Sequence, residues 1–248
     1  MTRIPAWLTT QPIAHRGLHD LAAGIPENSL AAFTAAAEAG YAIELDLQPA
    51  ADHEPMVFHD DGLERLTGRT GTFRDLPSEA LADIRLTGSD QHIPTLKTVL
   101  ATVAGAAPLL IELKGMAPAV GVLESRVADL LGDYDGVVAV QSFNPHSMGW
   151  FADNAPSFIR GQVATDFASY DEQRVSLTKR LLLSTLLLNR VSRPDFVAYN
   201  VKKLPRLAPL SARRRGTPLL AWTVRNANDR AVAARYADNI IFEGFRPT

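Results

Sequence analysis

Residues 42–47, AIELDL, decide the fold together with the other short apolar runs that share their pattern. Such runs, rich in branched apolar residues, are typical of strands buried on both faces in a parallel sheet. Ala-rich amphipathic segments separate them, and the clearest covers residues 29–40, with Asn28 expected as its N-cap and Gly40 at its end. The eight predicted strands begin at Pro12, Ala42, Leu109, Val137, Phe158, Phe196, Leu219 and Asn239.

The alternation of strands and helices predicts an α/β chain. With eight strands it favours a closed (β/α)₈ TIM barrel over an open sheet. Residues 60–94 break the rhythm with turn signals such as Thr67-Gly68-Arg69, which predicts a small insertion after strand 2. We find no linker and no internal repeat, so residues 1–248 are interpreted as one domain.

Composition excludes several classes of function. The 248 residues carry a formal net charge of −2. The chain therefore lacks the excess of basic residues that is typical of a nucleic-acid-binding protein. The chain has no cysteine, and this excludes disulfides, thiolate metal sites and a cysteine nucleophile. Residues 1–11 lack the pattern of a signal peptide, so a cytoplasmic location is expected. The oligomeric state is left open.

The longest apolar stretch covers residues 181–188, LLLSTLLL. It is shorter than the roughly 18 residues that a membrane span requires. Lys179, Arg180 and Arg190 lie around it. We interpret it as a buried amphipathic helix, and the alternative is a weak contact with a membrane surface.

Carboxylates lie at alternate positions on the second predicted strand. Glu44 and Asp46 share one face, and in a barrel that face points inward near the end where barrel enzymes place their sites. Two adjacent buried carboxylates repel, and a divalent cation would balance their charge. On the third strand, Glu112 adds an oxygen ligand and Lys114 a positive charge, although a buried ion pair between them is the alternative.

Two histidines follow predicted apolar runs. In His15-Arg16-Gly17, the imidazole suits proton transfer near neutral pH, and the guanidinium offers a planar fork of donors to phosphate. His59 ends a second apolar run in the same way. Each histidine alone is equally consistent with a packing residue. Together with the carboxylates and Lys114, they form the side-chain inventory of phosphoryl transfer.

In order and spacing these residues resemble the glycerophosphodiester phosphodiesterase family over nearly the whole chain. The motifs that carry the resemblance are His15-Arg16-Gly17, Pro26-Glu27-Asn28-Ser29, Ala32-Phe33, Glu44-Leu45-Asp46, His59-Asp60, Leu63-Glu64-Arg65, Thr67-Gly68, Ile93-Pro94-Thr95-Leu96, Ile111-Glu112-Leu113-Lys114, Gln141-Ser142-Phe143 and Trp222-Thr223-Val224.

The resemblance implies a hydrolase of lipid and glycerol metabolism. Its small-molecule substrate would be a glycerophosphodiester, and its products an alcohol and glycerol 3-phosphate. Mg²⁺ or Ca²⁺ is the implied cofactor, in agreement with a ligand set of three carboxylates and no cysteine. The implied residues are Glu44, Asp46 and Glu112 for the metal, His15 and His59 for acid–base catalysis, and Arg16, Lys114 and Trp222 for the substrate.

The sequence leaves alternative mechanisms and functions open. One histidine would deprotonate either the glycerol hydroxyl beside the phosphate, forming a cyclic diester that water then opens, or a water molecule that attacks directly. The alternative function is a phospholipid-directed phosphodiesterase of the lysophospholipase D kind, with residues 181–188 at a membrane surface. A catalytically silent binding barrel is disfavoured, because no member of the catalytic set is missing.

Selectivity is expected to depend on residues near the ends of the last two strands. Trp222 would present a flat apolar wall to the glycerol carbons, although a core aromatic is the alternative. Arg225 and Phe242-Glu243 stand where the family often has asparagine and a Thr-Asp pair. A solvated Arg225 predicts a preference for glycerophosphoglycerol or glycerophosphoinositol over glycerophosphocholine.

Overall fold

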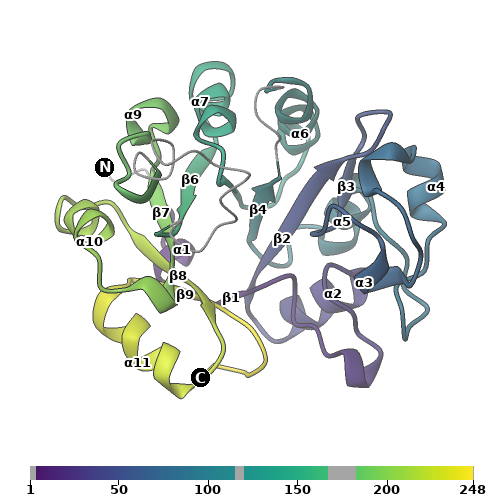
Figure 1. The fold of residues 1–248 in the computed structure, drawn as a ribbon, viewed down its shortest axis with the longest axis horizontal. Helices are drawn as coiled ribbons and strands as arrows, with labels where there is room; N and C mark the ends of the chain where they lie inside the picture. Colours follow the sequence, from purple (N-terminus) through teal and green to yellow (C-terminus); the bar gives the residue numbers. More distant parts are fainter. Residues whose placement is uncertain (1–3, 115–119, 167–182, 248) are drawn as a thin grey trace. The chain divides into compact units, whose positions relative to one another are not determined.

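The computed structural model describes residues 4–114, 120–166 and 183–247. These residues form two compact units, Ile13–Ala139 and Val140–Thr248, the second of which includes Met1–Pro12. Both units alternate parallel strands with helices (Figure 1). The chain has the (β/α)₈ barrel fold that the sequence predicts.

The unit Ile13–Ala139 is built on a parallel sheet with the strand order β1-β2-β4. A short antiparallel strand, β3, pairs with the end of β2. Helices α2 and α5 contact each other within this unit. The elements are β1 (Ile13–Ala14), η1 (Leu21–Ala23), α2 (Leu30–Glu38), β2 (Ala42–Pro49), β3 (Pro55–Val57), α3 (Glu64–Thr67), η2 (Phe73–Asp75), α4 (Ser78–Ala82), α5 (Leu96–Val103), β4 (Leu109–Leu113) and α6 (Val122–Gly132).

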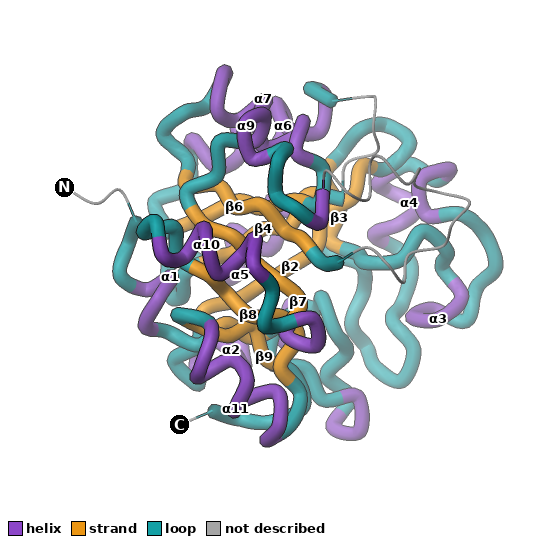
Figure 2. Tube along the Cα trace, turned by 60° about the vertical axis from the view of Figure 1, so that its left-hand side comes forward, coloured by secondary structure: helices purple, strands orange, loops and turns teal. Residues whose placement is uncertain are grey.

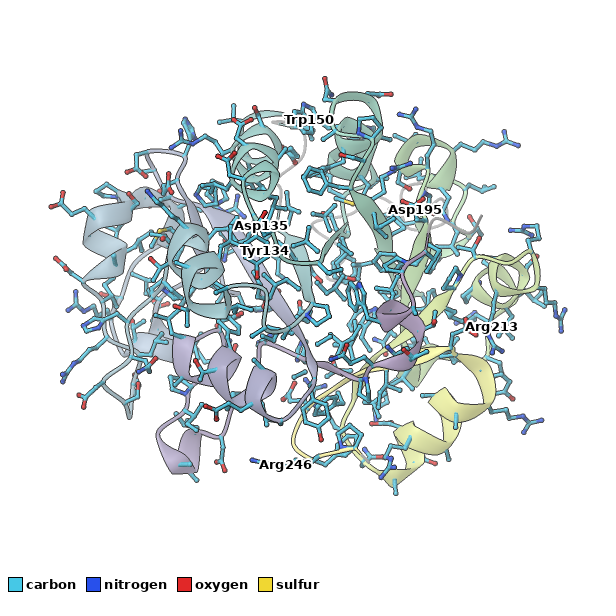
Figure 3. The ribbon with its side chains drawn as sticks, turned by 180° about the vertical axis from the view of Figure 1, so that it is seen from behind. Tyr134, Asp135, Trp150, Asp195, Arg213 and Arg246 are labelled. Atoms are coloured by element: carbon cyan, nitrogen blue, oxygen red, sulfur yellow. The ribbon has the colours of Figure 1, made fainter. Side chains whose placement is uncertain are left out.

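The second unit continues the pattern with the strand order β5-β6-β7-β8-β9, and β6 to β9 pair in parallel. In Figure 3, Arg213 marks α10; its guanidinium contacts Asp238 at 2.8 Å and so ties the helix to the start of β9. The elements are α1 (Trp7–Thr10), β5 (Val138–Ser142), α7 (Pro145–Asn154), β6 (Ile159–Ala164), α9 (Asn189–Ser192), β7 (Phe196–Asn200), η3 (Val201–Lys203), α10 (Leu207–Arg214), β8 (Leu219–Val224), α11 (Ala227–Tyr236) and β9 (Asn239–Phe242).

The predicted insertion, residues 60–94, contains the short elements α3, η2 and α4, joined by loops, and β3 lies just before it (Figure 2). Together with the β3 segment it has an apolar core, in which the rings of Phe58 and Phe73 stack at 4.9 Å. The departure from the barrel rhythm begins earlier than the predicted residue 60, because β3 already turns back against β2. A three-residue strand that starts with proline has too short an apolar alternation to be recognised from sequence.

The start of α2 differs from the prediction. Asn28 was the expected cap, but Ser29 takes that place: its backbone is extended, and its Oγ accepts a hydrogen bond from the Ala32 N–H at 3.2 Å. Asn28 has a left-handed φ of 56°, whereas an N-cap residue normally has an extended backbone. Its side chain is buried and contacts Asp46 instead. Gly40, with φ of 75°, follows the end of the helix as predicted.

The apolar stretch 181–188 lies partly outside the described residues, which resume at 183. Leu186 is buried in the core of the second unit, and Leu187 is 54% exposed. Turns rather than a helix occupy 185–188, so the predicted continuous helix is not present over these four residues. Among the helices that the structure describes, none has the length and apolar character to cross a bilayer.

Candidate active site

Three buried carboxylates converge near the carboxyl ends of β2 and β4. The parallel register pairs Asp46 with Glu112, and Glu44 lies two residues before Asp46 on the same face. One carboxylate oxygen from each residue lies within 4.8 Å of the others. The structure therefore brings together the three metal ligands predicted from the sequence, inside the unit Ile13–Ala139.

The surroundings of these carboxylates shift their pKa values in opposite directions. Burial, followed by repulsion from Asp46 and Glu112, raises the pKa of Glu44 well above its usual range. Burial would also raise the pKa of Asp46, but Lys114 and then Arg16 lower it far below the usual range. Asp46 is therefore held in its charged form, whereas burial and repulsion favour the protonated form of Glu44.

The donor set fits a divalent cation. With all three carboxylates ionised, they carry one more charge than the two cationic side chains beside them, Arg16 and Lys114, can balance. Burial and then repulsion from Asp46 and Glu112 raise the pKa of Glu44, and a bound cation would offset that repulsion. Hard carboxylate oxygens at this spacing are the ligands that oxygen-preferring divalent ions take.

A strained turn after β1 carries Arg16 to the cluster. Arg16 and Gly17 both have left-handed backbones, with φ of 58° and 80°. The Arg16 N–H donates to Glu44 Oε2 at 2.9 Å. A Cβ on Gly17 would lie 2.8 Å from the Ala32 carbonyl carbon, so only glycine fits against α2 at this position. Strained backbone of this kind tends to occur at functional sites.

Arg16 and Lys114 lie against the carboxylates. Arg16 Nη1 contacts Glu27 Oε1 at 2.6 Å, and its Nε lies 3.3 Å from Asp46 Oδ2. Lys114 Nζ contacts Glu112 Oε1 at 2.6 Å and Asp46 Oδ1 at 3.0 Å. The buried ion pair considered from sequence is thus present, and it lies within the predicted metal site. Both cationic side chains therefore border the carboxylate cluster.

Asn28 is a site residue that the sequence interpretation missed. Its Nδ2 donates to Asp46 Oδ2 at 3.0 Å, and its Oδ1 accepts from the Asp46 N–H at 3.3 Å. This two-way contact fixes both the backbone and the carboxylate of Asp46. The signal was its place in Pro26-Glu27-Asn28-Ser29, but the following helix favoured interpretation as a cap.

His59 is oriented by the residue that follows it. Its Nδ1 lies 2.6 Å from Asp60 Oδ1. A bond to an ionised carboxylate requires a proton on Nδ1, which leaves Nε2 as the proton acceptor in the neutral ring. The His59 side chain is about one-third exposed, at 32%, so solvent and small substrates can reach it.

His15 is the second predicted catalytic histidine, and it is half-buried in the turn after β1. Burial raises the pKa of Asp46, and Lys114, Arg16, His59 and His15 lower it. Both histidines therefore lie close enough to Asp46 to affect its pKa. The fold brings together at Asp46 two residues that are 44 positions apart in the sequence.

Comparison with known proteins identifies the family of the chain. Residues 15–242 match the glycerophosphoryl diester phosphodiesterase family. The chain belongs to this family. YhdW of Bacillus subtilis, provisionally named a glycerophosphodiester phosphodiesterase, is 31% identical over 252 residues, covering 94% of this chain and 97% of the relative. A B. subtilis glycerophosphodiester phosphodiesterase is 28% identical over 242 residues, with 88% and 77% coverage.

Solved structures share the fold of this family member. An Oleispira antarctica phosphodiesterase in complex with sn-glycerol-3-phosphate superposes with a TM-score of 0.78 at 20% identity, covering 95% of this chain and 93% of that chain. The glycerophosphodiester phosphodiesterase of Agrobacterium tumefaciens gives 0.68 at 23% identity, covering 94% and 96%. Family membership makes the chain a phosphoric diester hydrolase.

Two predicted selectivity residues of this phosphodiesterase lie in the second unit. Trp222, on β8, is half-buried and packs edge-on against Phe143 with ring centroids 5.5 Å apart. Arg225 follows β8 and is half-exposed, and its Nη2 contacts Glu243 Oε2 at 2.8 Å. The two departures from the family pattern are therefore partners in one ion pair. Glu243 offsets the charge that was expected to attract anionic head groups.

Proposed function

We propose that the chain hydrolyses small glycerophosphodiesters to an alcohol and glycerol 3-phosphate, with Mg²⁺ or Ca²⁺ held by Glu44, Asp46 and Glu112. The observation that carries this proposal is the set of three buried carboxylates within 4.8 Å, with Lys114 in contact with two of them. The product bound to the Oleispira antarctica relative, sn-glycerol-3-phosphate, supports the same substrate class.

The phosphate-binding residues are Arg16 and Lys114. Arg16 Nε and Lys114 Nζ contact different oxygens of the Asp46 carboxylate. A phosphate that approaches the carboxylates would therefore also contact both cationic side chains. When bound, the divalent ion would polarise a phosphate oxygen and lower the pKa of the attacking hydroxyl. Arg16 and Lys114 offset the charge that develops on the remaining phosphate oxygens.

His59 is the first base in this proposal. Asp60 holds the proton on Nδ1, so Nε2 accepts the proton of the attacking hydroxyl. His15 donates a proton to the oxygen of the departing alcohol as the phosphorus–oxygen bond breaks. If the attacking group is the glycerol hydroxyl, water then opens the cyclic diester with the two histidines in reversed roles. If it is water, glycerol 3-phosphate forms in one step.

The test is product release from a panel of diesters. Glycerophosphoglycerol, glycerophosphoinositol, glycerophosphoethanolamine and glycerophosphocholine are incubated with the enzyme in Mg²⁺ or Ca²⁺, and glycerol 3-phosphate is measured with a coupled dehydrogenase. We expect turnover of at least one diester, and ³¹P spectra would reveal a cyclic intermediate. Failure to release glycerol 3-phosphate from all four would contradict the proposed substrate class.

A phospholipid-directed activity at a membrane surface is the second candidate, and the exposed Leu187 favours it. In that case the enzyme should sediment with anionic liposomes, and Leu187→Ser should reduce the sedimented fraction. It should also cleave a lysophospholipid faster than a soluble diester. Sedimentation equal to that of a liposome-free control would remove this candidate and leave the first one unaffected.

A further inference from the structure

The insertion sends two arginines into the surroundings of His59. Arg65 lies on α3 and contacts Asp60, the residue after His59. Arg74 lies on η2 and contacts Gln48 on β2 and the Lys114 carbonyl after β4. Nothing in the acid–base scheme requires an insertion at this place. The contacts between the insertion and the residues around His59 therefore indicate a further role for the insertion.

Arg65 joins two carboxylates through paired hydrogen bonds. Its Nε and Nη2 donate to Asp60 Oδ2 and Oδ1 at 2.5 and 2.9 Å. Its Nη1 and Nη2 donate to Glu27 Oε2 and Oε1 at 2.9 and 2.8 Å. The same Glu27 contacts Arg16, and the same Asp60 contacts His59. Charges of alternating sign thus run from Arg16 to the imidazole.

Arg65 contributes to the site mainly by fixing the orientation of the carboxylates that it binds, and only little to the free energy of unfolding. Its side chain is 48% exposed, and ion pairs at that exposure add little to the free energy of unfolding. The planar fork does restrict the rotation of each carboxylate that it binds at two points. Asp60 is held so that Oδ1 stays directed at His59 Nδ1, and this orients the ring.

Arg74 acts on the backbone around the same histidine. Its Nε donates to Gln48 Oε1 at 3.1 Å, and its Nη2 donates to the Lys114 carbonyl at 2.6 Å. Gln48 is fully buried, and its Nε2 donates to the carbonyls of Phe58 and Asp60 at 3.1 and 2.8 Å. The amide therefore clamps the residues on either side of His59, and Arg74 fixes which way the amide faces.

We propose that the insertion is a positioning element for His59: Arg65 sets the orientation of its ring through Asp60, and Arg74 sets the position of its backbone through Gln48. This inference rests on the proposed role of His59 as a base. Both arginines are positioning residues, because their contacts reach Asp60 and Gln48 rather than the reacting atoms.

The main test is Arg65→Gln, with Arg65→Lys to keep the charge and remove the fork. Misplacing a catalytic group by about 1 Å can cost about 10²-fold, so we expect kcat to fall between about 10- and 10²-fold in both variants. KM should change by less than about threefold, since the phosphate-binding residues are intact. The matched control is Arg85→Gln, which removes an exposed ion pair with Asp90 elsewhere in the insertion. Native kcat in Arg65→Gln would overturn the proposal.

A double-mutant cycle separates this inference from the proposed function. If Arg65 acts through His59, then adding Arg65→Gln to His59→Ala should lower kcat by less than about twofold more. Near-native turnover in His59→Ala would contradict the role of His59 itself. A strong loss in His59→Ala followed by a further loss of about tenfold or more from Arg65→Gln would contradict only the positioning role.

A spectroscopic measurement needs neither metal nor substrate. Long-range ¹H–¹⁵N spectra report which ring nitrogen of His59 carries the proton, and the native enzyme should show protonated Nδ1. Arg65→Gln should reduce that signature, whereas Arg85→Gln should preserve it. For the backbone clamp, Gln48→Glu keeps the acceptor for Arg74 and removes both donors to the carbonyls; it should lower kcat about tenfold. Unchanged His59 signals in Arg65→Gln would refute the role of Arg65 in orienting the ring. Native kcat in Gln48→Glu would refute the role of Gln48 and Arg74 in positioning the backbone.

Discussion

Asn28→Ala should affect both stability and metal affinity, because the Asn28 side chain supports Asp46 in two ways. The substitution removes the donor to the Asp46 carboxylate and the acceptor of its N–H. Leaving a buried polar group unsatisfied costs about 1–3 kcal/mol, and alanine at a left-handed φ of 56° adds about 1–2 kcal/mol. We therefore expect the free energy of unfolding to fall by about 2–5 kcal/mol.

Two further variants separate the free-energy cost of the lost side-chain contacts from the cost of the backbone conformation. Asn28→Gly removes the side-chain contacts without the backbone penalty, so it should be about 1 kcal/mol more stable than Asn28→Ala. His53→Ala is the matched control for replacing an exposed side chain at a left-handed position, since His53 has a φ of 66°. Histidine and alanine both carry a Cβ, so this variant should lose less than about 1 kcal/mol and leave metal affinity unchanged.

Urea unfolding without metal measures the stabilities, and calorimetric titration with Mg²⁺ and Ca²⁺ measures the affinities. Loss of a residue that supports a metal ligand typically costs 10- to 100-fold in affinity, and we expect Asn28→Ala and Asn28→Gly to fall in that range of roughly 10–100-fold. If Asn28→Ala lost no more stability than His53→Ala and bound metal normally, the contacts with Asp46 would carry no such function.

Three other predictions concern catalysis, acid stability and selectivity. His15→Ala and His59→Ala should each lower kcat by about 10²-fold or more while circular dichroism stays native, and normal turnover of either would refute its role. Burial tends to raise the pKa of Glu27, but Arg65 and Arg16 hold that pKa below its usual range. The ionised Glu27 therefore stabilises the folded state above about pH 4.3, the pKa of glutamate in the unfolded chain. This stabilisation is lost as the pH falls through the lower pKa of the folded state. Glu27→Gln should accordingly destabilise the protein more at pH 7 than at pH 3.5 in urea unfolding, and an equal effect at both pH values would contradict this sign. Because Glu243 offsets Arg225, Glu243→Gln should increase kcat/KM for glycerophosphoinositol relative to glycerophosphocholine, whereas Arg225→Asn should shift the ratio the other way; unchanged ratios would mean that the pair does not select the head group.

The elements that sequence reasoning predicted well are those with strong local patterns. The inward alternation of Glu44 and Asp46 follows from the two-residue period of a strand, and the third carboxylate, Glu112, was found by the same rule. Gly17 belongs to the motif His15-Arg16-Gly17, and its close approach to α2 explains why a glycine stands there. A family resemblance added the pairing of His15 with His59, which no local pattern contains.

The features that were missed depend on contacts between residues distant in sequence. Asn28 looked like a helix cap because the helix begins two residues later, yet its partner is Asp46 on β2. The contacts of Arg74 with Gln48 and the Lys114 carbonyl join three segments, and no spacing rule predicts such a set. The pairing of Arg225 with Glu243 likewise combined two departures that had been considered separately.

The proposed chemistry depends above all on a divalent ion held by the three carboxylates. The most direct measurement is glycerol 3-phosphate release by one enzyme preparation before EDTA treatment, after it, and after Mg²⁺ or Ca²⁺ is added back. Asp46→Asn serves as the variant that lacks the charge of one proposed ligand. We predict that turnover is lost in EDTA, returns with metal in the native enzyme, and stays low in Asp46→Asn at the same metal concentration. Full turnover in EDTA, or native metal-dependent turnover in Asp46→Asn, would contradict the central claim.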